Sequence, residues 1–305
     1  MRIAIPDLVS NSYFPAIAAV ELGFMREEGV DAELELLFPV TDAARGLRDG
    51  RFDFLAGAAH APLYAFPNWR GAKLVSALSQ HMYWFLVTRA DLPVERGGVS
   101  ALRDVNIGAA AGVGEGLRQL LEKSGVDIDA AHIRIAPVPG TDSASVSFGV
   151  TAAQALADGR IDGFWANGMG AEVAVRNGVG KVIVDARRDG DPGASFTFPA
   201  LSTTQKLIDE QPETVAAAVR AIVRAQKALR SDPSLATGIG EKLYPAMEAT
   251  LIAKIVERDA PFYDATISES TVVGLNGFAR RAGLLTSAVG YEQVVATQFA
   301  SLWGV

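Results

Sequence analysis

A seven-residue pattern occurs twice in this chain of 305 residues: residues 47–53 read LRDGRFD, and residues 156–162 read LADGRID. Each copy follows a helix-like run and leads into an apolar, strand-like segment. Gly50 and Gly159 stand where a helix should end, because glycine enters the left-handed conformation without steric cost. Each copy therefore predicts a helix, a glycine stop and a buried parallel strand, with Asp53 and Asp162 near the start of that strand.

The similarity between the two copies extends further back along the chain. Residues 28–31 read EGVD before the first copy, and residues 124–127 read SGVD before the second. The distance between the copies is far longer than the period of a solenoid repeat, so we interpret them as a duplicated α/β unit. The alternative is that Asp-Gly-Arg is simply a common way for a helix to end.

The composition bounds the class of protein. Hydrophobic residues make up 49% and charged residues 21% of the chain, which is enough for one large or two ordinary globular domains. The net charge is −7 and no Lys/Arg run is present, which argues against a nucleic-acid partner. The absence of cysteine excludes disulfides and thiolate sites, and no stretch approaches the roughly 20 apolar residues of a membrane span.

The chain opens with an apolar segment. Met1 is followed at once by residues 2–5, RIAI, which we interpret as the first strand rather than as a signal peptide. We therefore expect a periplasmic protein if a leader was removed, with a cytoplasmic location as the alternative.

Strand-like and helix-like segments alternate in the first two thirds of the chain. Strands are expected at 2–8, 31–38, 52–57 and 73–78, and the pattern restarts at 105–110 and continues to a strand at 181–185. This alternation predicts parallel sheets with right-handed crossovers. Ser12 and Thr41 are candidate helix N-caps. From about Thr203 the chain is expected to be helical, with helices at 203–210, 212–230, 233–243, 247–259, 268–282 and 290–302 that pack on the first sheet.

Two extended connections suggest where the chain passes between domains. They lie near residues 79–92 and 194–202. We expect a first lobe of residues 1–86 plus 198–305, and a second lobe of residues 87–197.

Several motifs together resemble a known family. Residues 21–24 (ELGF), 28–31 (EGVD), 47–53 and 158–162 (DGRID) are similar, in order and spacing, to periplasmic solute-binding proteins of the nitrate/taurine/sulfonate type, which include a thiamine pyrimidine-precursor branch. The resemblance covers nearly the whole chain. It implies an α/β, two-lobe periplasmic-binding-protein-like fold of class 2, with a ligand cleft between the lobes and delivery of the ligand to an ABC transporter permease. Some relatives on this fold are enzymes or sensors.

Ligands of open α/β sheets bind beyond the carboxyl ends of the strands. This rule selects the loops at 9–13, 38–42, 57–61, 79–84, 110–116, 139–143 and 165–170. The candidate ligand-binding residues are Ser12, Tyr13, Phe38, Thr41, Ala59, His60, His81, Trp84, Gly114, Glu115, Trp165, Asn167 and Phe198. The loops after the early strands carry rings and no arginine, which favours a planar or apolar organic ligand with an acceptor group over a small inorganic anion.

Each candidate also has a structural explanation. Ser12 and Thr41 can be simple caps, Trp165 can be a core residue, and His60 and His81 can be buried structural histidines. The glycine-rich stretch at residues 112–116 does not have dinucleotide-binding spacing, and no histidine has zinc-site spacing, so we expect no cofactor and no metal.

The sequence favours a binding protein over an enzyme, because it contains no nucleophile elbow and no P-loop. The alternatives are a decarboxylase or pyrimidine-forming enzyme with His60 or His81 as the acid–base group, and a ligand-sensing protein. We expect a monomer that binds a small organic molecule and no nucleic acid.

Overall fold

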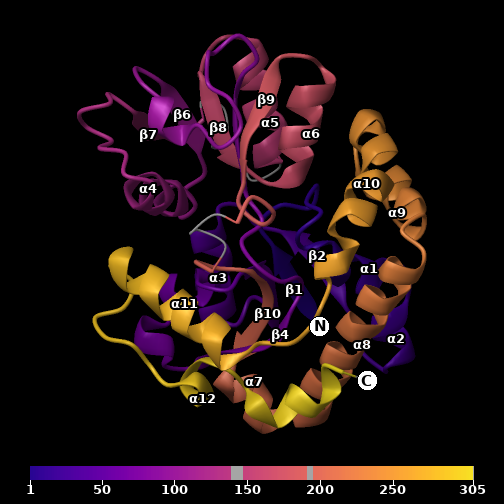
Figure 1. Ribbon diagram of the computed structural model, residues 1–305. Helices are drawn as coiled ribbons and strands as arrows, with labels where there is room; N and C mark the ends of the chain where they lie inside the picture. Colours follow the sequence, from indigo (N-terminus) through magenta and orange to yellow (C-terminus); the bar gives the residue numbers. More distant parts are fainter. Residues whose placement is uncertain (139–146, 191–194, 305) are drawn as a thin grey trace. The chain divides into compact units, whose positions relative to one another are not determined.

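The computed structural model describes residues 1–138, 147–190 and 195–304 (Figure 1). The chain divides into two compact units, one of Met1–His81 with Phe196–Val305 and one of Met82–Ser195. The chain thus crosses between the units near the two connections expected from the sequence. The assignment of residues 1–86 plus 198–305 and of residues 87–197 to two domains stays a prediction.

The first unit contains a five-stranded sheet in the order β2-β1-β3-β10-β4. Its strands are β1 (Arg2–Ile5), β2 (Glu33–Leu36), β3 (Phe54–Ala58), β4 (Ala72–Ala77) and β10 (Pro199–Thr204). β1 pairs in parallel with β2 and β3, whereas β10 runs antiparallel between β3 and β4. The expectation of a purely parallel sheet was therefore wrong for one strand: the segment that returns to this unit enters at the carboxyl edge and runs back through the sheet.

The second unit contains a sheet of the same design, in the order β7-β6-β8-β5-β9. Its strands are β5 (Phe85–Arg89), β6 (Asn106–Ala109), β7 (Arg134–Ala136), β8 (Gly163–Ala166) and β9 (Gly180–Asp185). Again one strand, β5 in the fourth place, is antiparallel to both of its neighbours. The matching order and directions of the two sheets support the duplication inferred from the sequence.

The glycines of the two repeated stretches end helices as predicted. Gly50 has φ of +73° and Gly159 has φ of +67°, which is the left-handed region. The next residue in each copy donates its N–H back to a carbonyl five residues earlier, from Arg51 to Gly46 at 2.9 Å and from Arg160 to Ala155 at 2.9 Å. This is the bonding of a Schellman motif, and it satisfies a carbonyl at the helix end.

The last aspartate of each repeated stretch ties two strands together. The Asp53 carboxylate accepts a hydrogen bond from the backbone N–H of Arg2, at the start of β1, at 2.7 Å. In the second unit, the Asp162 carboxylate accepts from the backbone N–H of Asn106, at the start of β6, at 2.8 Å. The repeated stretch therefore has a structural role at the amino edge of each sheet. In both units its aspartate binds the first backbone N–H of the neighbouring strand.

The helices between the strands are α1 (Phe14–Glu21), α2 (Phe24–Glu27) and α3 (Val40–Arg48) in the first unit, and α4 (Gly114–Lys123), α5 (Phe148–Ala157) and α6 (Gly168–Arg176) in the second. The apolar pattern of residues 13–28 predicts one helix, but the structure breaks it into α1 and α2 at Gly23, whose φ of +83° is not helical.

The capping interpretations of Ser12 and Thr41 were wrong. The residues before α1 and α3 are Tyr13 and Pro39, and Thr41 lies inside α3.

The helices at the C-terminal end are α7 (Gln205–Glu210), α8 (Pro212–Ser231), α9 (Leu235–Leu243), α10 (Ala246–Asp259), α11 (Glu269–Arg281) and α12 (Tyr291–Val294). α7, α8 and α12 contact strands of the first sheet, and α11 packs on it through a shared core cluster, as expected, whereas α9 and α10 pack on each other and on other helices (Figure 1). The Gln226 amide in α8 donates to two carbonyls at the end of β4, at 3.1 and 3.0 Å. The Glu28 carboxylate binds α8 through Arg220, at 2.6 Å, and Arg224, at 3.1 Å.

Two helices of the second unit approach each other through glycine. A Cβ atom added at Gly170 in α6 would lie 2.6 Å from the carbonyl oxygen of Gly149 in α5. Larger residues at this contact would push the helix backbones apart. Among the described residues, no helix is long and apolar enough to cross a membrane.

Candidate functional site

The candidate residues lie at the carboxyl edges of the two sheets. In the first unit the edge carries the loops that follow β1, β2, β3 and β4 and the turn that precedes β10, with Ser12, Tyr13, Phe38, Thr41, Ala59, His60, His81 and Phe198. In the second unit the edge carries the loops after β6 and β8 and the segment before β5, with Trp84, Gly114, Glu115, Trp165 and Asn167. The expected loop at 139–143 lies outside the described residues. That these residues contact one ligand stays a prediction.

His60 follows β3 and is fully buried. Its Nδ1 lies 3.0 Å from the Thr197 hydroxyl, and its ring meets the rings of Tyr64 and Phe278 edge-on at centroid distances of 5.9 and 5.0 Å. These contacts give His60 the environment of a structural histidine that links the β3 loop to α11. A role in ligand binding remains a prediction for this residue.

The other histidine of this edge has a different setting. His81 is exposed, with a left-handed backbone (φ +63°), and its ring lies 6.1 Å from the ring of Phe262. The preceding residue, Gln80, holds this loop to the C-terminal part of the chain: its side-chain amide donates to the carbonyls of Asp264 and Thr266 at 2.9 and 2.8 Å.

Ala59, Phe198 and Phe38 contribute mainly apolar surface. Ala59 and Phe198 are buried together in a core cluster under α11, and the Ala59 N–H donates to the Phe198 carbonyl at 2.7 Å. Phe38 is partly buried and precedes Pro39 through a cis peptide bond.

A buried polar cluster forms where the β1 loop meets α9, α10 and the turn after α10. We call it the Asn11 cluster; its residues are Asp7, Asn11, Tyr244, Asp259 and Tyr263, together with Ser12, which follows Asn11 in the chain and is fully buried. The Asn11 side-chain amide donates to the Asp259 carboxylate, and the Tyr263 hydroxyl donates to the Asn11 carbonyl at 2.9 Å. Burial raises the pKa of Tyr244 well above its usual value, and the negative charge of nearby Asp7 and the neighbouring Tyr263 phenol add to the shift.

Sequence reasoning found only Ser12 of this cluster. It missed Tyr244, Asp259 and Tyr263, because these residues lie in helical segments far from the early loops. Asp259 is 248 residues away from Asn11 along the chain, and Tyr263 is 252 residues away. Pro245 and Pro261 could have pointed to these residues. Prolines mark the ends of helices, and Tyr244, Asp259 and Tyr263 lie within two residues of one of them.

Aromatic rings gather at the carboxyl edge of the second unit. Trp84 lies 5.9 Å from Trp165 and 5.0 Å from Tyr83 between ring centroids, and all three side chains are buried. The indole N–H of Trp165 is buried without a hydrogen-bond partner among the described residues. Gly116, at the start of α4, leaves room for the Trp84 ring, which a Cβ atom would approach to 2.9 Å.

The polar candidates of this edge have partners in their own unit. The Asn167 side-chain oxygen caps α6, accepting from the N–H groups of Met169 and Gly170 at 3.0 and 3.2 Å. Glu115 accepts a hydrogen bond from Gln119 at 3.0 Å, one turn along α4. Gly114 is the first residue of that helix.

The loop after β9 adds a buried arginine to the same edge. Arg187 is buried, and its backbone N–H donates to the Asp185 carboxylate at 3.2 Å. The loops selected from the sequence ended at 165–170 and so did not include this residue.

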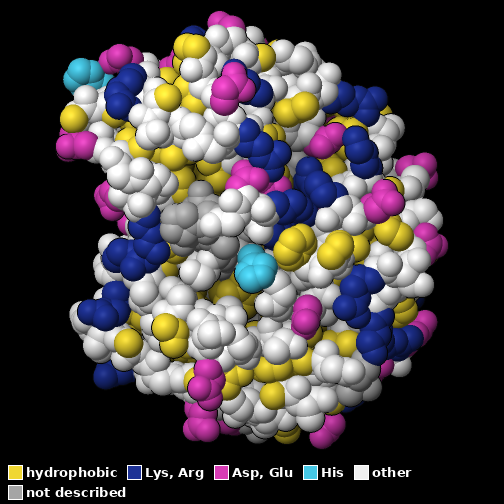
Figure 2. All heavy atoms as spheres, in the orientation of Figure 1, with side chains coloured by type: hydrophobic (Ala, Val, Ile, Leu, Met, Phe, Trp, Pro, Cys, Tyr) yellow, Lys and Arg dark blue, Asp and Glu magenta, His cyan; other side chains and the backbone are white. Residues whose placement is uncertain are grey.

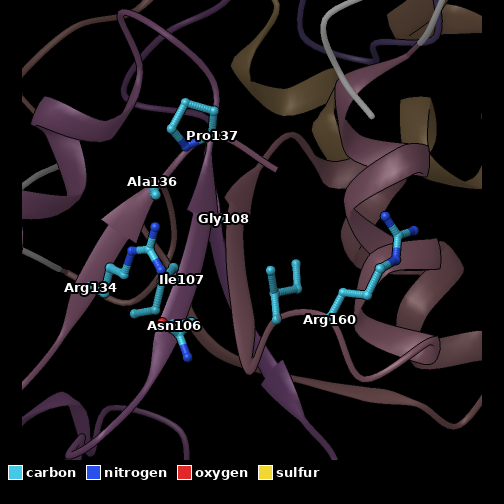
Figure 3. A pocket seen from close by; sticks show the side chains of 8 residues that line it. Asn106, Ile107, Gly108, Arg134, Ala136, Pro137 and Arg160 are labelled. Carbon is cyan, nitrogen blue, oxygen red and sulfur yellow. The ribbon is translucent and has the colours of Figure 1, made fainter. Parts of the chain in front are cut away.

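Hollows also occur at the amino edges, at the repeated stretches. One of about 180 Å³ in the second unit is lined by Asn106, Arg134 and Arg160 among others, with the two arginines on different sides (Figure 3). The Arg160 guanidinium is held by Asp158 at 2.9 Å. One of about 500 Å³ in the first unit borders the first repeated stretch. Pockets for organic ligands are about 300–1,000 Å³, so the smaller hollow is a poor candidate.

The surface charges are mixed in sign, as the absence of a Lys/Arg run in the sequence suggests. Basic and acidic side chains are interspersed on the face seen in Figure 2. Among the described residues no group of three or more metal-ligating side chains is present.

Solved structures of two periplasmic binding proteins resemble this chain over most of its length. The sulfonate-binding protein SsuA of Methylobacillus flagellatus KT is similar, with 19% identity, coverage of 99% of this chain and 92% of that one, and a TM-score of 0.67. The nitrate-binding protein NrtA of Synechocystis PCC 6803 is similar over 99% and 86% of the chains, with 12% identity and a TM-score of 0.69. The fold is therefore the two-lobe fold of the periplasmic binding proteins, as expected from the sequence.

Residues 10–236 match the family described as NMT1/THI5 like, and the chain belongs to this family. No curated protein matches it. The same fold also occurs in the desulfurization enzyme DSZB, with 17% identity, coverage of 98% and 97%, and a TM-score of 0.68.

Proposed function

We propose that this protein is a solute-binding protein that captures a small organic molecule and delivers it to an ABC importer. The observation that carries the proposal is the likeness of nearly the whole chain to sulfonate- and nitrate-binding proteins of the periplasm. Function is not fixed by fold, so the carboxyl edges matter as a second support: they hold buried polar and aromatic groups where ligands of α/β sheets bind. A periplasmic location and a permease partner are parts of the same proposal.

For the body of the ligand we propose a planar or apolar organic group. The support is the ring cluster of Trp84, Trp165 and Tyr83 at the edge of the second unit, since aromatic side chains favour planar solutes.

An enzyme remains the second candidate, because the desulfurization enzyme DSZB shares the fold and a mutant of it was solved in complex with biphenyl-2-sulfinic acid. The present chain has no cysteine and so cannot supply a thiolate. Acid–base work would fall to His60 or His81. His60 is buried, with its Nδ1 beside the Thr197 hydroxyl and its ring against those of Tyr64 and Phe278, so little of this side chain is open to a reacting group.

The test is a thermal-shift screen of the purified protein against sulfonates, carboxylates, pyrimidines and aromatic acids, followed by calorimetry on the best ligand. A ligand at 100 times its Kd should stabilise the protein by about 2.7 kcal/mol. Trp165→Ala and His60→Ala are then titrated beside Trp303→Ala, whose indole N–H donates to the Val75 carbonyl in β4 at 2.9 Å and which is not a candidate ligand-binding residue. A loss of about 1–3 kcal/mol of affinity in Trp165→Ala alone or in both edge variants supports the proposal. Equal affinity in all variants, or a preference for nitrate or sulfate, contradicts the organic ligand.

A further inference from the structure

Three polar atoms of the Asn11 cluster are buried without partners. The Asn11 side-chain oxygen, the Ser12 hydroxyl and the Tyr244 hydroxyl each expose less than 1 Å² and have no hydrogen-bond partner among the described residues. Buried polar groups in proteins are almost always hydrogen-bonded. Three exceptions within one cluster, at the edge where ligands of this fold class bind, indicate that something other than the described residues completes their bonds.

The chemistry of these three atoms is defined by their neighbours. Because a carboxylate only accepts hydrogen bonds, the Asn11 atom that faces Asp259 must be the NH₂ group, and the remaining atom is an acceptor. The Tyr244 phenol stays protonated, since burial, Asp7 and Tyr263 all raise its pKa. The site therefore offers one acceptor and the hydroxyls of Tyr244 and Ser12, each of which can donate or accept a hydrogen bond.

The charge of the cluster disfavours an anion. Asp7 and Asp259 are 7% and 1% exposed, and the Arg258 Nε forms an ion pair with the Asp259 carboxylate at 3.5 Å. A carboxylate or sulfonate would add a negative charge beside these two carboxylates and has no N–H to offer the Asn11 oxygen.

We propose that the Asn11 cluster binds a nitrogen-bearing head group of the solute, an N–H donor of the carboxamide or amidine type, rather than an anionic group. The N–H donates to the Asn11 oxygen, and the hydroxyls of Tyr244 and Ser12 bond the other atom of the head group. The inference rests on the proposed function and adds to it the chemistry of one end of the ligand.

The experiment uses three probes that share one ring: benzamide, benzamidine and benzoate. Each is titrated to millimolar concentration into the full-length protein by calorimetry. We expect benzamide or benzamidine to bind about tenfold or more tightly than benzoate, because benzoate leaves the Asn11 oxygen unbonded. The benzamide and benzamidine arms distinguish a neutral from a cationic head group, and either result supports the proposal.

Two variants test the residues, and one serves as a control. Ser12→Ala and Tyr244→Phe remove unpartnered hydroxyls, so the fold loses no hydrogen bond, and each should weaken the preferred probe about 3- to 10-fold. Ser76→Ala removes another buried, unpartnered hydroxyl, but inside β4, and should leave affinity unchanged.

The proposal is overturned if benzoate binds as tightly as the nitrogen probes, if none of the three binds, or if Ser12→Ala and Tyr244→Phe behave like Ser76→Ala. If a wider screen still yields a ligand in those cases, the proposed function stands and only the head-group inference fails. If no solute of any class binds, both fail. Equal probe affinities with lower stability of both cluster variants would identify a structural water at the cluster instead.

Discussion

The two tyrosines of the Asn11 cluster should respond in opposite ways to the same substitution. Tyr244→Phe removes a hydroxyl that is buried without a partner, and an unmet buried polar group costs about 1–3 kcal/mol. We therefore expect this variant to raise the free energy of unfolding of the ligand-free protein by about 1 kcal/mol. Tyr263→Phe removes a hydroxyl that donates to the Asn11 carbonyl at 2.9 Å, and should lower it by about 1–2 kcal/mol.

The assay is urea unfolding of the two variants and the parent protein, followed by circular dichroism with fitted midpoints and slopes. With unchanged slopes, a shift in midpoint reports stability directly. The two variants should differ by about 2–3 kcal/mol. If Tyr244→Phe is destabilised as much as Tyr263→Phe, the Tyr244 hydroxyl has a partner in the free protein and the argument for an incomplete site is refuted.

Three further outcomes follow from the fold. Glu28→Gln should lower stability by about 0.5–1 kcal/mol at neutral pH. Because the Arg220 hydrogen bond lowers the pKa of Glu28, the loss measured in urea titrations should begin to shrink as pH falls below 4.5 and vanish once pH is below the lowered pKa; a loss that does not shrink with falling pH contradicts the ion pair. Gly170→Ala should lower the free energy of unfolding by about 1–3 kcal/mol, because its Cβ would collide with the Gly149 backbone. Gly238→Ala in α9, with open space around it, should raise that free energy by about 0.5–1 kcal/mol. Equal shifts of melting temperature in the two variants would refute the close helix contact. Asp162→Ala should cost about 1–3 kcal/mol and speed hydrogen exchange of the Asn106 amide, and unchanged exchange would show that this tie does not hold the strand end.

Much of the fold was predictable because its signals are local. The glycine stops at Gly50 and Gly159 and the apolar runs after them define helix ends and buried strands from a few neighbouring residues. The direction of β10 was not predictable in this way. The residue types of a strand do not reveal its direction in the sheet. β10 is antiparallel to β3 and β4 because the chain returns to the first unit at the carboxyl edge of its sheet.

The candidate site was predictable only in part. The rule of carboxyl ends selected segments around the ends of strands, although some of their residues lie in β3 and β8 or in the first turns of α3, α4 and α6. The rule does not say which side chains are free to meet a ligand. Asn167 is engaged as a helix cap, and Ser12, expected to be a cap, has a hydroxyl without a partner. Tyr244 and Tyr263 reach the edge through the packing of helices more than 200 residues away from the β1 loop, which no local pattern encodes.

The central claim is that the protein binds an organic solute reversibly and does not transform it. The most direct measurement is a calorimetric titration of the best ligand from the screen, followed by mass spectrometry of the ligand recovered after long incubation. The account predicts saturable binding of one ligand per chain and complete recovery of the unchanged compound. Loss of the ligand with formation of a product, or no saturable binding of any organic solute, would contradict it.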